Sequence, residues 1–224
     1  MAGLGFTQGE RDMRVQAGPN IAAVVLAGGR GERLGGAVKA ELKVGGVRLL
    51  ERVLARVSAC RPIVVAHGPH DPAALRLPAE TLAVADLPSS YAGPLAGVAA
   101  AIAALPAEVE LLVCAAVDSP FLPEDYVDRL AAGLGTAPAA IASYGGQPYP
   151  TSSIWRLAQF RDLPERVLAG TAPRSLKSLA AAAGGVTLEW PEDPAGDPFA
   201  NVNTAEDLAL AEARAARSAA GFRQ

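Results

Sequence analysis

The chain has 224 residues, of which 50% are hydrophobic, and its formal net charge is −3 at pH 7. This length can bury a full core in one α/β domain, and the small negative charge gives no reason to expect a nucleic-acid partner. No apolar run approaches the roughly 20 residues that a membrane-spanning helix needs. Residues 1–20 carry charges and no apolar segment, so we expect a flexible N-terminal tail and a single domain over 21–220, in the cytoplasm.

Strand and helix patterns alternate along the chain. The first half predicts strands at residues 21–26, 62–66, 81–85 and 110–117, and helices at 48–59, 95–105 and 123–133. The second half predicts a hairpin with strands 139–143 and 151–155, helical segments near 156–169 and 175–183, a strand at 186–190 and a helix from 205 to about 219. The alternation favours a three-layer α/β fold with a mostly parallel, Rossmann-like sheet, and the hairpin predicts an antiparallel interruption in its second half.

A glycine-rich loop follows the first predicted strand. Between Leu26 and Lys39 it holds five glycines and three cations. Because glycine has no Cβ, the backbone N–H groups of such a loop can approach a polyphosphate closely, while Arg33 and Lys39 can bind its oxygens. The spacing fits neither the dinucleotide fingerprint, whose third glycine is Leu34 here, nor a P-loop, which needs Ser or Thr after its lysine. The sequence therefore predicts a phosphate-binding loop of another type, with a plain strand-to-helix turn as the alternative.

Two aspartates come directly after predicted strands. Asp86 follows the strand at 81–85, and Asp118 follows the strand at 110–117. Because parallel strands end at one edge of a sheet, we expect both carboxylates near the glycine loop. Asp118 could bind Mg²⁺, which takes one or two carboxylates and completes its shell with waters and substrate phosphates, and Asp86 could accept two N–H bonds from guanine. The alternative role for each is that of a turn or helix-capping residue.

Asn201 and Asn203 alternate on a segment that we expect to be extended, which places both amides on one face. Thr204 and Asp207 predict a capping box at the start of the last helix, so part of this segment is helix architecture.

Four segments, in chain order, resemble motifs of the nucleotidyltransferases related to molybdenum cofactor guanylyltransferase. They are the glycine loop ending at Lys39, Asp86 with residues 91–97, residues 117–123 and residues 199–204, and together they span residues 22–208. The resemblance implies transfer of GMP from GTP to the phosphate of molybdopterin, with Mg²⁺ as cofactor and pyrophosphate as the leaving group. It also implies transient contact with proteins that insert or accept the molybdenum cofactor.

The resemblance further implies which residues form the site. Arg33, Lys39 and Asp118 would be catalytic, and Asp118 would also hold the metal. Asn201 and Asn203 would donate to the pterin or to a phosphate. The nucleotide would be bound by Leu26, Ala27, Gly28, Gly29, Gly31, Lys39, Asp86, Gly93 and Asp118.

Three residues depart from the family pattern. Val38 stands where an aspartate often precedes the lysine, Ala66 where an asparagine commonly helps to bind GTP, and Tyr149 where a histidine is frequent. These changes bear on nucleotide affinity and base choice more than on the fold. Transfer of CMP to molybdopterin or another nucleotide transfer therefore stays open, as does a nucleotide-binding regulator without catalysis. Asp86 and residues 93–97 favour guanine.

Overall fold

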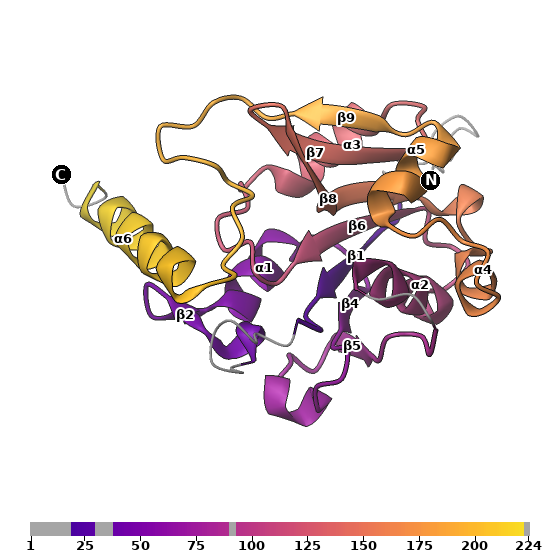
Figure 1. Ribbon diagram of the computed structural model, residues 1–224, viewed down its shortest axis with the longest axis horizontal. Helices are drawn as coiled ribbons and strands as arrows, with labels where there is room; N and C mark the ends of the chain where they lie inside the picture. Colours follow the sequence, from indigo (N-terminus) through magenta and orange to yellow (C-terminus); the bar gives the residue numbers. More distant parts are fainter. Residues whose placement is uncertain (1–18, 30–37, 90–92, 222–224) are drawn as a thin grey trace, which may run out of the picture.

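The computed structural model describes residues 19–29, 38–89 and 93–221, with side chains up to residue 218 (Figure 1). The predicted tail lies outside this range except for its last two residues. Gly31 and Arg33 of the glycine loop lie outside it as well.

Within the described residues, seven strands form one sheet in the order β5-β4-β1-β6-β8-β7-β9. Their bounds are Ile21–Leu26 (β1), Ile63–Ala66 (β4), Thr81–Val84 (β5), Leu111–Ala116 (β6), Ala139–Tyr144 (β7), Gln147–Arg156 (β8) and Val186–Glu189 (β9). β1 pairs in parallel with β4 and β6, β5 pairs in parallel with β4, and β9 pairs in parallel with β7. β8 pairs antiparallel with β6 and β7. The predicted parallel sheet and its antiparallel interruption are both confirmed.

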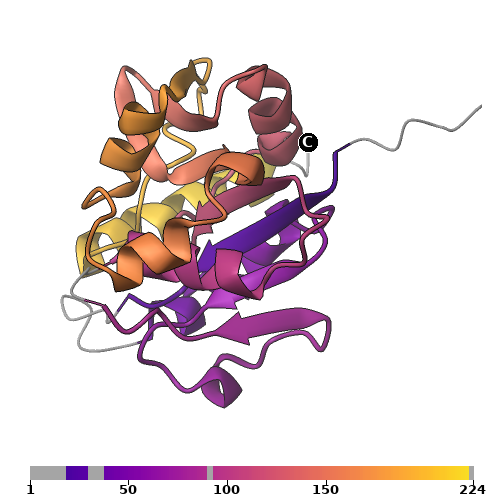
Figure 2. The ribbon, with the colours of Figure 1, turned by 90° about the vertical axis from the view of Figure 1, so that its right-hand side faces the viewer.

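Helices cover both faces of this sheet, which confirms the predicted three layers (Figures 1 and 2). On one face lie α1 (Leu49–Arg56) and α3 (Tyr126–Leu134), and on the other lie α2 (Pro94–Ala104), α4 (Leu163–Leu168) and α5 (Leu176–Ala183). A sixth helix, α6 (Ala205–Gly221), lies beside the short strand β2 (Lys43–Val44), where the Gly45 N–H donates to Glu212 at 2.9 Å. No helix in the described part of the chain is both long and apolar enough to cross a bilayer.

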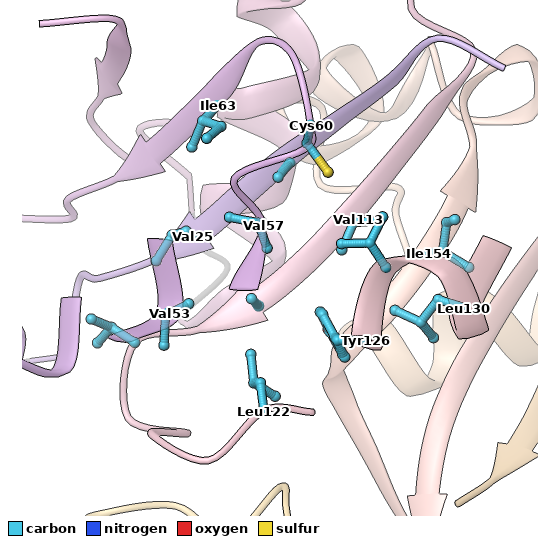
Figure 3. Close-up of a cluster of buried hydrophobic side chains, with 14 of the residues drawn as sticks. Val25, Val53, Val57, Cys60, Ile63, Val113, Leu122, Tyr126, Leu130 and Ile154 are labelled. Carbon is cyan, nitrogen blue, oxygen red and sulfur yellow. The ribbon is translucent and has the colours of Figure 1, made fainter. Parts of the chain in front are cut away.

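The side chains of β1 divide between two buried clusters. Ala23 and Val25 pack with α1 and α3, whereas Ala22 and Val24 pack with α2. Figure 3 shows the first cluster, in which Val25 lies with residues such as Leu130. Successive side chains of a strand point to opposite faces, so a strand that is covered on both faces must be apolar throughout. This requirement explains the uninterrupted apolar run that made β1 easy to predict.

The structure corrects two predicted boundaries. The hairpin strand predicted at 151–155 begins at Gln147, because Gly145 and Gly146 adopt φ values of 57° and 76° and close a turn of two residues. The helix predicted near 156–169 is wrong in its first part, since β8 continues to Arg156, opposite Leu111. Only the short turn η5 (Leu157–Gln159) and α4 form from the remainder.

A second short hairpin was not predicted. It joins β2 to β3 (Val47–Arg48) through Gly45 and Gly46, again with positive φ at both glycines. Just before it, the turn η3 (Lys39–Glu41) follows the glycine loop. Its Glu41 accepts a hydrogen bond of 2.6 Å from Arg48, which also donates to the Leu75 carbonyl at 3.0 Å. The turn that carries Lys39 is thereby fixed to its surroundings.

The loops that follow β1 and β4 touch through two glycines. A Cβ placed on Gly68 would lie 2.6 Å from the Cα of Gly28, and Gly68 has a φ of 57°. Both the close approach and the left-handed backbone require glycine at this position. The contact holds the start of the glycine loop against the end of β4.

Gly68→Ala is expected to destabilise the chain for two reasons that a control can separate. Gly46→Ala has a similar positive φ but open space around its Cβ, so it should cost about 1–2 kcal/mol for the backbone alone. Gly68→Ala should cost about 1–3 kcal/mol more, because the added methyl overpacks the loop contact. Urea unfolding measures both values, and equal losses in the two variants would show that the contact is not tight.

Candidate functional site

A pocket of about 270 Å³ lies at the carboxyl ends of β1, β4 and β6. It is lined by residues from distant parts of the chain: Leu26, Gly28, Gly29, Lys39, Ala66, Asp86, Gly93, Pro94, Gly97, Ala116, Val117, Asp118, Thr151 and Asn201. Most predicted site residues are on this lining. Ala27 is not, because its side chain is fully buried in the core below, where its N–H donates to the Ala66 carbonyl at 2.8 Å.

Lys39 and Asp118 form an ion pair in the pocket. The lysine Nζ donates to Oδ2 of Asp118 at 2.7 Å, and it also donates to Oδ1 of Asn203 at 2.5 Å. Lys39 is only 9% exposed, so its charge depends on these two partners for compensation. Asn203 does not line the pocket itself, but it holds the lysine that does.

Asn201, the other asparagine predicted for the site, lines the pocket itself. Its Oδ1 accepts a hydrogen bond of 2.7 Å from the hydroxyl of Ser119, which leaves the amide N–H groups to donate elsewhere. The intervening Val202 donates its N–H to the carbonyl of Asp118 at 2.8 Å. Ser119 was not predicted as a site residue, although it lies inside the predicted motif at residues 117–123.

The predicted capping box at the start of α6 is confirmed. Asp207 accepts hydrogen bonds from the N–H groups of Asn203 and Thr204, at 2.9 and 2.8 Å, and its own N–H donates to the Thr204 hydroxyl at 3.1 Å. The bond from the Asn203 backbone is the main cause that lowers the pKa of Asp207. The same cap that starts the helix therefore also fixes the backbone of Asn203.

Asp86 lies at the opposite side of the pocket, after β5. A Cβ on Gly97 of α2 would lie 3.1 Å from Oδ1 of Asp86 and 3.1 Å from the Ala66 side chain, so glycine there keeps the carboxylate accessible. Burial raises the pKa of Asp86 above its ordinary value, and the nearby His67 acts in the opposite direction. A half-buried carboxylate with both oxygens at a pocket wall can accept a pair of N–H groups.

Three comparisons bear on this arrangement. The family model described as a MobA-like NTP transferase domain matches residues 23–186. The chain is 40% identical over 202 residues to a molybdenum cofactor guanylyltransferase from Rhodobacter capsulatus, covering 89% of this chain and 98% of that protein. It is 36% identical over 203 residues to one from Nitrobacter hamburgensis, covering 88% and 96%. The chain belongs to the MobA-like NTP transferase family.

A solved structure agrees with this membership. Molybdopterin-guanine dinucleotide biosynthesis protein A from Archaeoglobus fulgidus superposes with a TM-score of 0.67 and 25% identity, over 88% of this chain and 99% of that one. The predicted family and fold are confirmed, and with them the class of enzyme, a nucleotidyltransferase. Arg33 and Gly31 remain predictions of the family motif, since they lie outside the described residues.

The three departures from the family pattern lie in different surroundings. Val38 is partly buried and packs against the core. Ala66 is 1% exposed and contributes to the pocket wall near Asp86, where an asparagine would bring an amide. Tyr149 lies on β8 outside the pocket lining, and its hydroxyl donates a hydrogen bond to Asp197.

The residues present fit a magnesium ion that is held mainly by substrate. In the described part of the chain, no group of three or more His, Cys, Asp or Glu side chains could cage a metal. Magnesium does not need such a cage, because one carboxylate, waters and nucleotide phosphates complete its octahedral shell. Asp118 would supply that carboxylate in this pocket, where its Oδ2 accepts a hydrogen bond from Lys39 at 2.7 Å.

Lys39→Ala is expected to reduce turnover by about 10²–10³-fold, because the pocket loses a fixed cation at the site of developing phosphate charge. It should also lower the free energy of unfolding by about 1–3 kcal/mol, since Asp118 and Asn203 lose their donor. The exposed Lys43→Ala is the matched control and should leave both quantities near wild type. Steady-state pyrophosphate release and urea unfolding give the two values, and near-normal turnover of Lys39→Ala would contradict the assignment.

Asp86→Asn is expected to separate nucleotide binding from stability. Because the pKa of Asp86 is raised in the folded chain, folding favours the protonated carboxyl. Its contribution to the free energy of unfolding is fully present below the pH where an unfolded aspartate titrates, and is lost as the pH rises through the folded pKa. At pH 7 the neutral asparagine should therefore unfold at the same or a higher urea concentration, whereas its KM for GTP should rise about tenfold or more. The stability difference should shrink on acidification, and a variant that loses stability at pH 7 would show that the charged form is favoured.

Proposed function

We propose that this chain transfers GMP from GTP to the phosphate of molybdopterin, which gives the guanine dinucleotide form of the cofactor and releases pyrophosphate. One observation carries the proposal: Lys39, Asp118 and Asp86 line a single pocket at the ends of parallel strands, so one nucleotide can meet all three. The similarity to molybdenum cofactor guanylyltransferases over nearly the whole chain supports the same reaction.

The guanine would lie toward Asp86 and the triphosphate toward Lys39. The Asp86 carboxylate would accept bonds from N1–H and the exocyclic amine, a pair of donors that cytosine lacks. Gly97 leaves room for the base beside this carboxylate. The glycines at 28 and 29 line the pocket between the two aspartates, where backbone can approach the phosphates.

In the reaction, an oxygen of the molybdopterin phosphate attacks the α-phosphorus of GTP, and the bond from that phosphorus to the bridging oxygen of pyrophosphate breaks. A phosphate oxygen is already nucleophilic, so the chain does not have to supply a general base. Lys39, together with Arg33 of the family motif, would neutralise charge on the triphosphate, and Asn201 would donate to a phosphate oxygen. Magnesium held by Asp118 would supply further positive charge at the α-phosphate and the leaving group.

The acceptor would bind in a neighbouring groove. This groove has a volume of about 440 Å³, shares Pro94, Thr151 and Asn201 with the nucleotide pocket, and is bordered by the exposed cations Arg174 and Lys177. Two cations beside a groove favour an anionic acceptor such as a pterin that carries a phosphate. Asn201, which lines both cavities, lies where acceptor and nucleotide would meet.

The test is incubation with molybdopterin, magnesium and each of GTP, CTP, ATP and UTP in turn, with pyrophosphate measured. GTP should be the preferred substrate, by at least tenfold in kcat/KM over CTP, because cytosine cannot satisfy the Asp86 carboxylate. Preferred turnover of CTP would support transfer of CMP instead. The observation that favours this alternative is Ala66, which stands where the family commonly has an asparagine that helps to bind GTP. Nucleotide binding without pyrophosphate release would support a regulator.

Excess chelator should abolish turnover in the same assay, and added magnesium should restore it. Asp118→Asn should lower turnover and raise the magnesium concentration needed for half-maximal rate, because an amide is a weaker ligand than a carboxylate. Undiminished turnover in excess chelator would argue against the metal.

A further inference from the structure

The segment that carries Asn201 and Asn203 is a long connection without helix or strand. It runs from Glu189, the end of β9, to Ala205, the start of α6. Catalytic positioning tolerates little displacement, and an error of about 1 Å can cost two orders of magnitude in rate. The connection therefore needs anchors, and the cap at Asp207 and the bond from Val202 to the Asp118 carbonyl hold only its last residues.

Asp197 is a further anchor, four residues before Asn201. One carboxylate oxygen, Oδ1, accepts the Phe199 N–H at 2.8 Å, and the other, Oδ2, accepts the hydroxyl of Tyr149. The backbone is held as well, because Arg214 of α6 donates to the carbonyls of Asp197 and Gly196 at 2.6 and 3.2 Å. Asp197 thus joins β8 to the connection through its carboxylate, and the connection to α6 through its backbone carbonyl.

Tyr149 is suited to this contact by its surroundings. Its ring packs on Phe199 with the centroids 5.3 Å apart, and Phe199 is fully buried. Burial, followed by the hydrogen bond to Asp197, raises the pKa of Tyr149 to about 12. The phenol consequently stays protonated, as a donor to the Asp197 carboxylate, throughout the neutral range.

We propose that Tyr149 is a positioning residue for the nucleotidyl transfer, whose hydroxyl fixes Asp197 and thereby places Asn201 at the pocket and Asn203 against Lys39. The inference rests on the proposed function, since it assigns those asparagines to the reacting phosphates and the lysine. Tyr149 borders the proposed acceptor groove but does not line the nucleotide pocket, and its phenol acts through Asp197. Its loss should therefore impair kcat and leave the KM for GTP close to wild type.

The experiment is a double-mutant cycle on Tyr149→Phe and Asp197→Ala. Tyr149→Phe keeps the ring on Phe199 and removes only the hydroxyl, and it should lower kcat about tenfold. If the hydroxyl acts through Asp197, the double variant should be no slower than Asp197→Ala alone. Effects that multiply in the double variant, or an unchanged kcat for Tyr149→Phe, would overturn the inference. Multiplying effects with a raised KM for molybdopterin would mean that the hydroxyl contacts the acceptor directly.

Tyr144→Phe is the matched control, because it removes the same group from the same hairpin. The Tyr144 hydroxyl accepts the N–H of Asp193 at 3.2 Å, at the far end of the connection, and its loss should leave kcat unchanged. A fall in kcat as large as that of Tyr149→Phe would show that any loosening of the connection is sufficient, and would remove the special role of Tyr149.

A spectroscopic readout keeps the contact testable if Asp197→Ala does not fold. The ultraviolet pH titration of the chain minus that of Tyr149→Phe isolates the phenol, and Asp197→Asn should shift its pKa from about 12 toward its ordinary value of 10. An unshifted pKa would refute the contact. An inactive wild-type chain would count against the proposed function, whereas an active one with independent effects counts only against this inference.

Discussion

The contact between Lys39 and Asp118 is the interaction on which the site depends. It joins residues 79 positions apart, and the second bond from Lys39, to Asn203, spans 164 positions. Neither charged group could lie at such low exposure alone, because an unpaired charge loses its solvation on burial. The sheet brings the segments to one edge, and the pairing of charges then decides how their side chains lie. Stability and the geometry of the pocket consequently share the same three side chains.

Most of the fold could be predicted because its strands are covered on both faces. The apolar run of β1 gave bounds identical to those in the structure, since no polar residue fits between two clusters. The error at residues 156–159 has the opposite origin. Arg156 continues β8 because Leu111 lies beside it in the sheet, and this neighbour is 45 positions away in the sequence. The hairpin of β2 and β3 is too short for a periodic pattern, and only its two positive-φ glycines mark it.

The site could be predicted as a set of residues, but not as a set of contacts. Asp86 and Asp118 were found because each follows an apolar strand, and the glycines because a phosphate loop needs them. The burial of Lys39 could not be inferred, since it results from partners on two other segments. The contact of Tyr149 with Asp197 is equally long-range, and Tyr149 was evident only as a departure from the family pattern. Local chemistry identifies groups, whereas their pairing follows from topology.

Because β8 runs antiparallel to its neighbours, the nucleotide pocket and the groove beside it are built from opposite ends of their strands. Parallel strands contribute the residues that follow their last hydrogen bonds, as β1, β5 and β6 do with the glycine loop and the two aspartates. An antiparallel strand instead reaches the same edge with its first residues, and Tyr149 and Thr151 come from that end of β8. Changes in the length or sequence of the turn between β7 and β8 would therefore reshape the proposed acceptor groove, whereas the parallel strands beside the nucleotide pocket would keep their arrangement. Related proteins could thus bind different acceptors through changes in this one turn, while they keep the same nucleotide-binding strands.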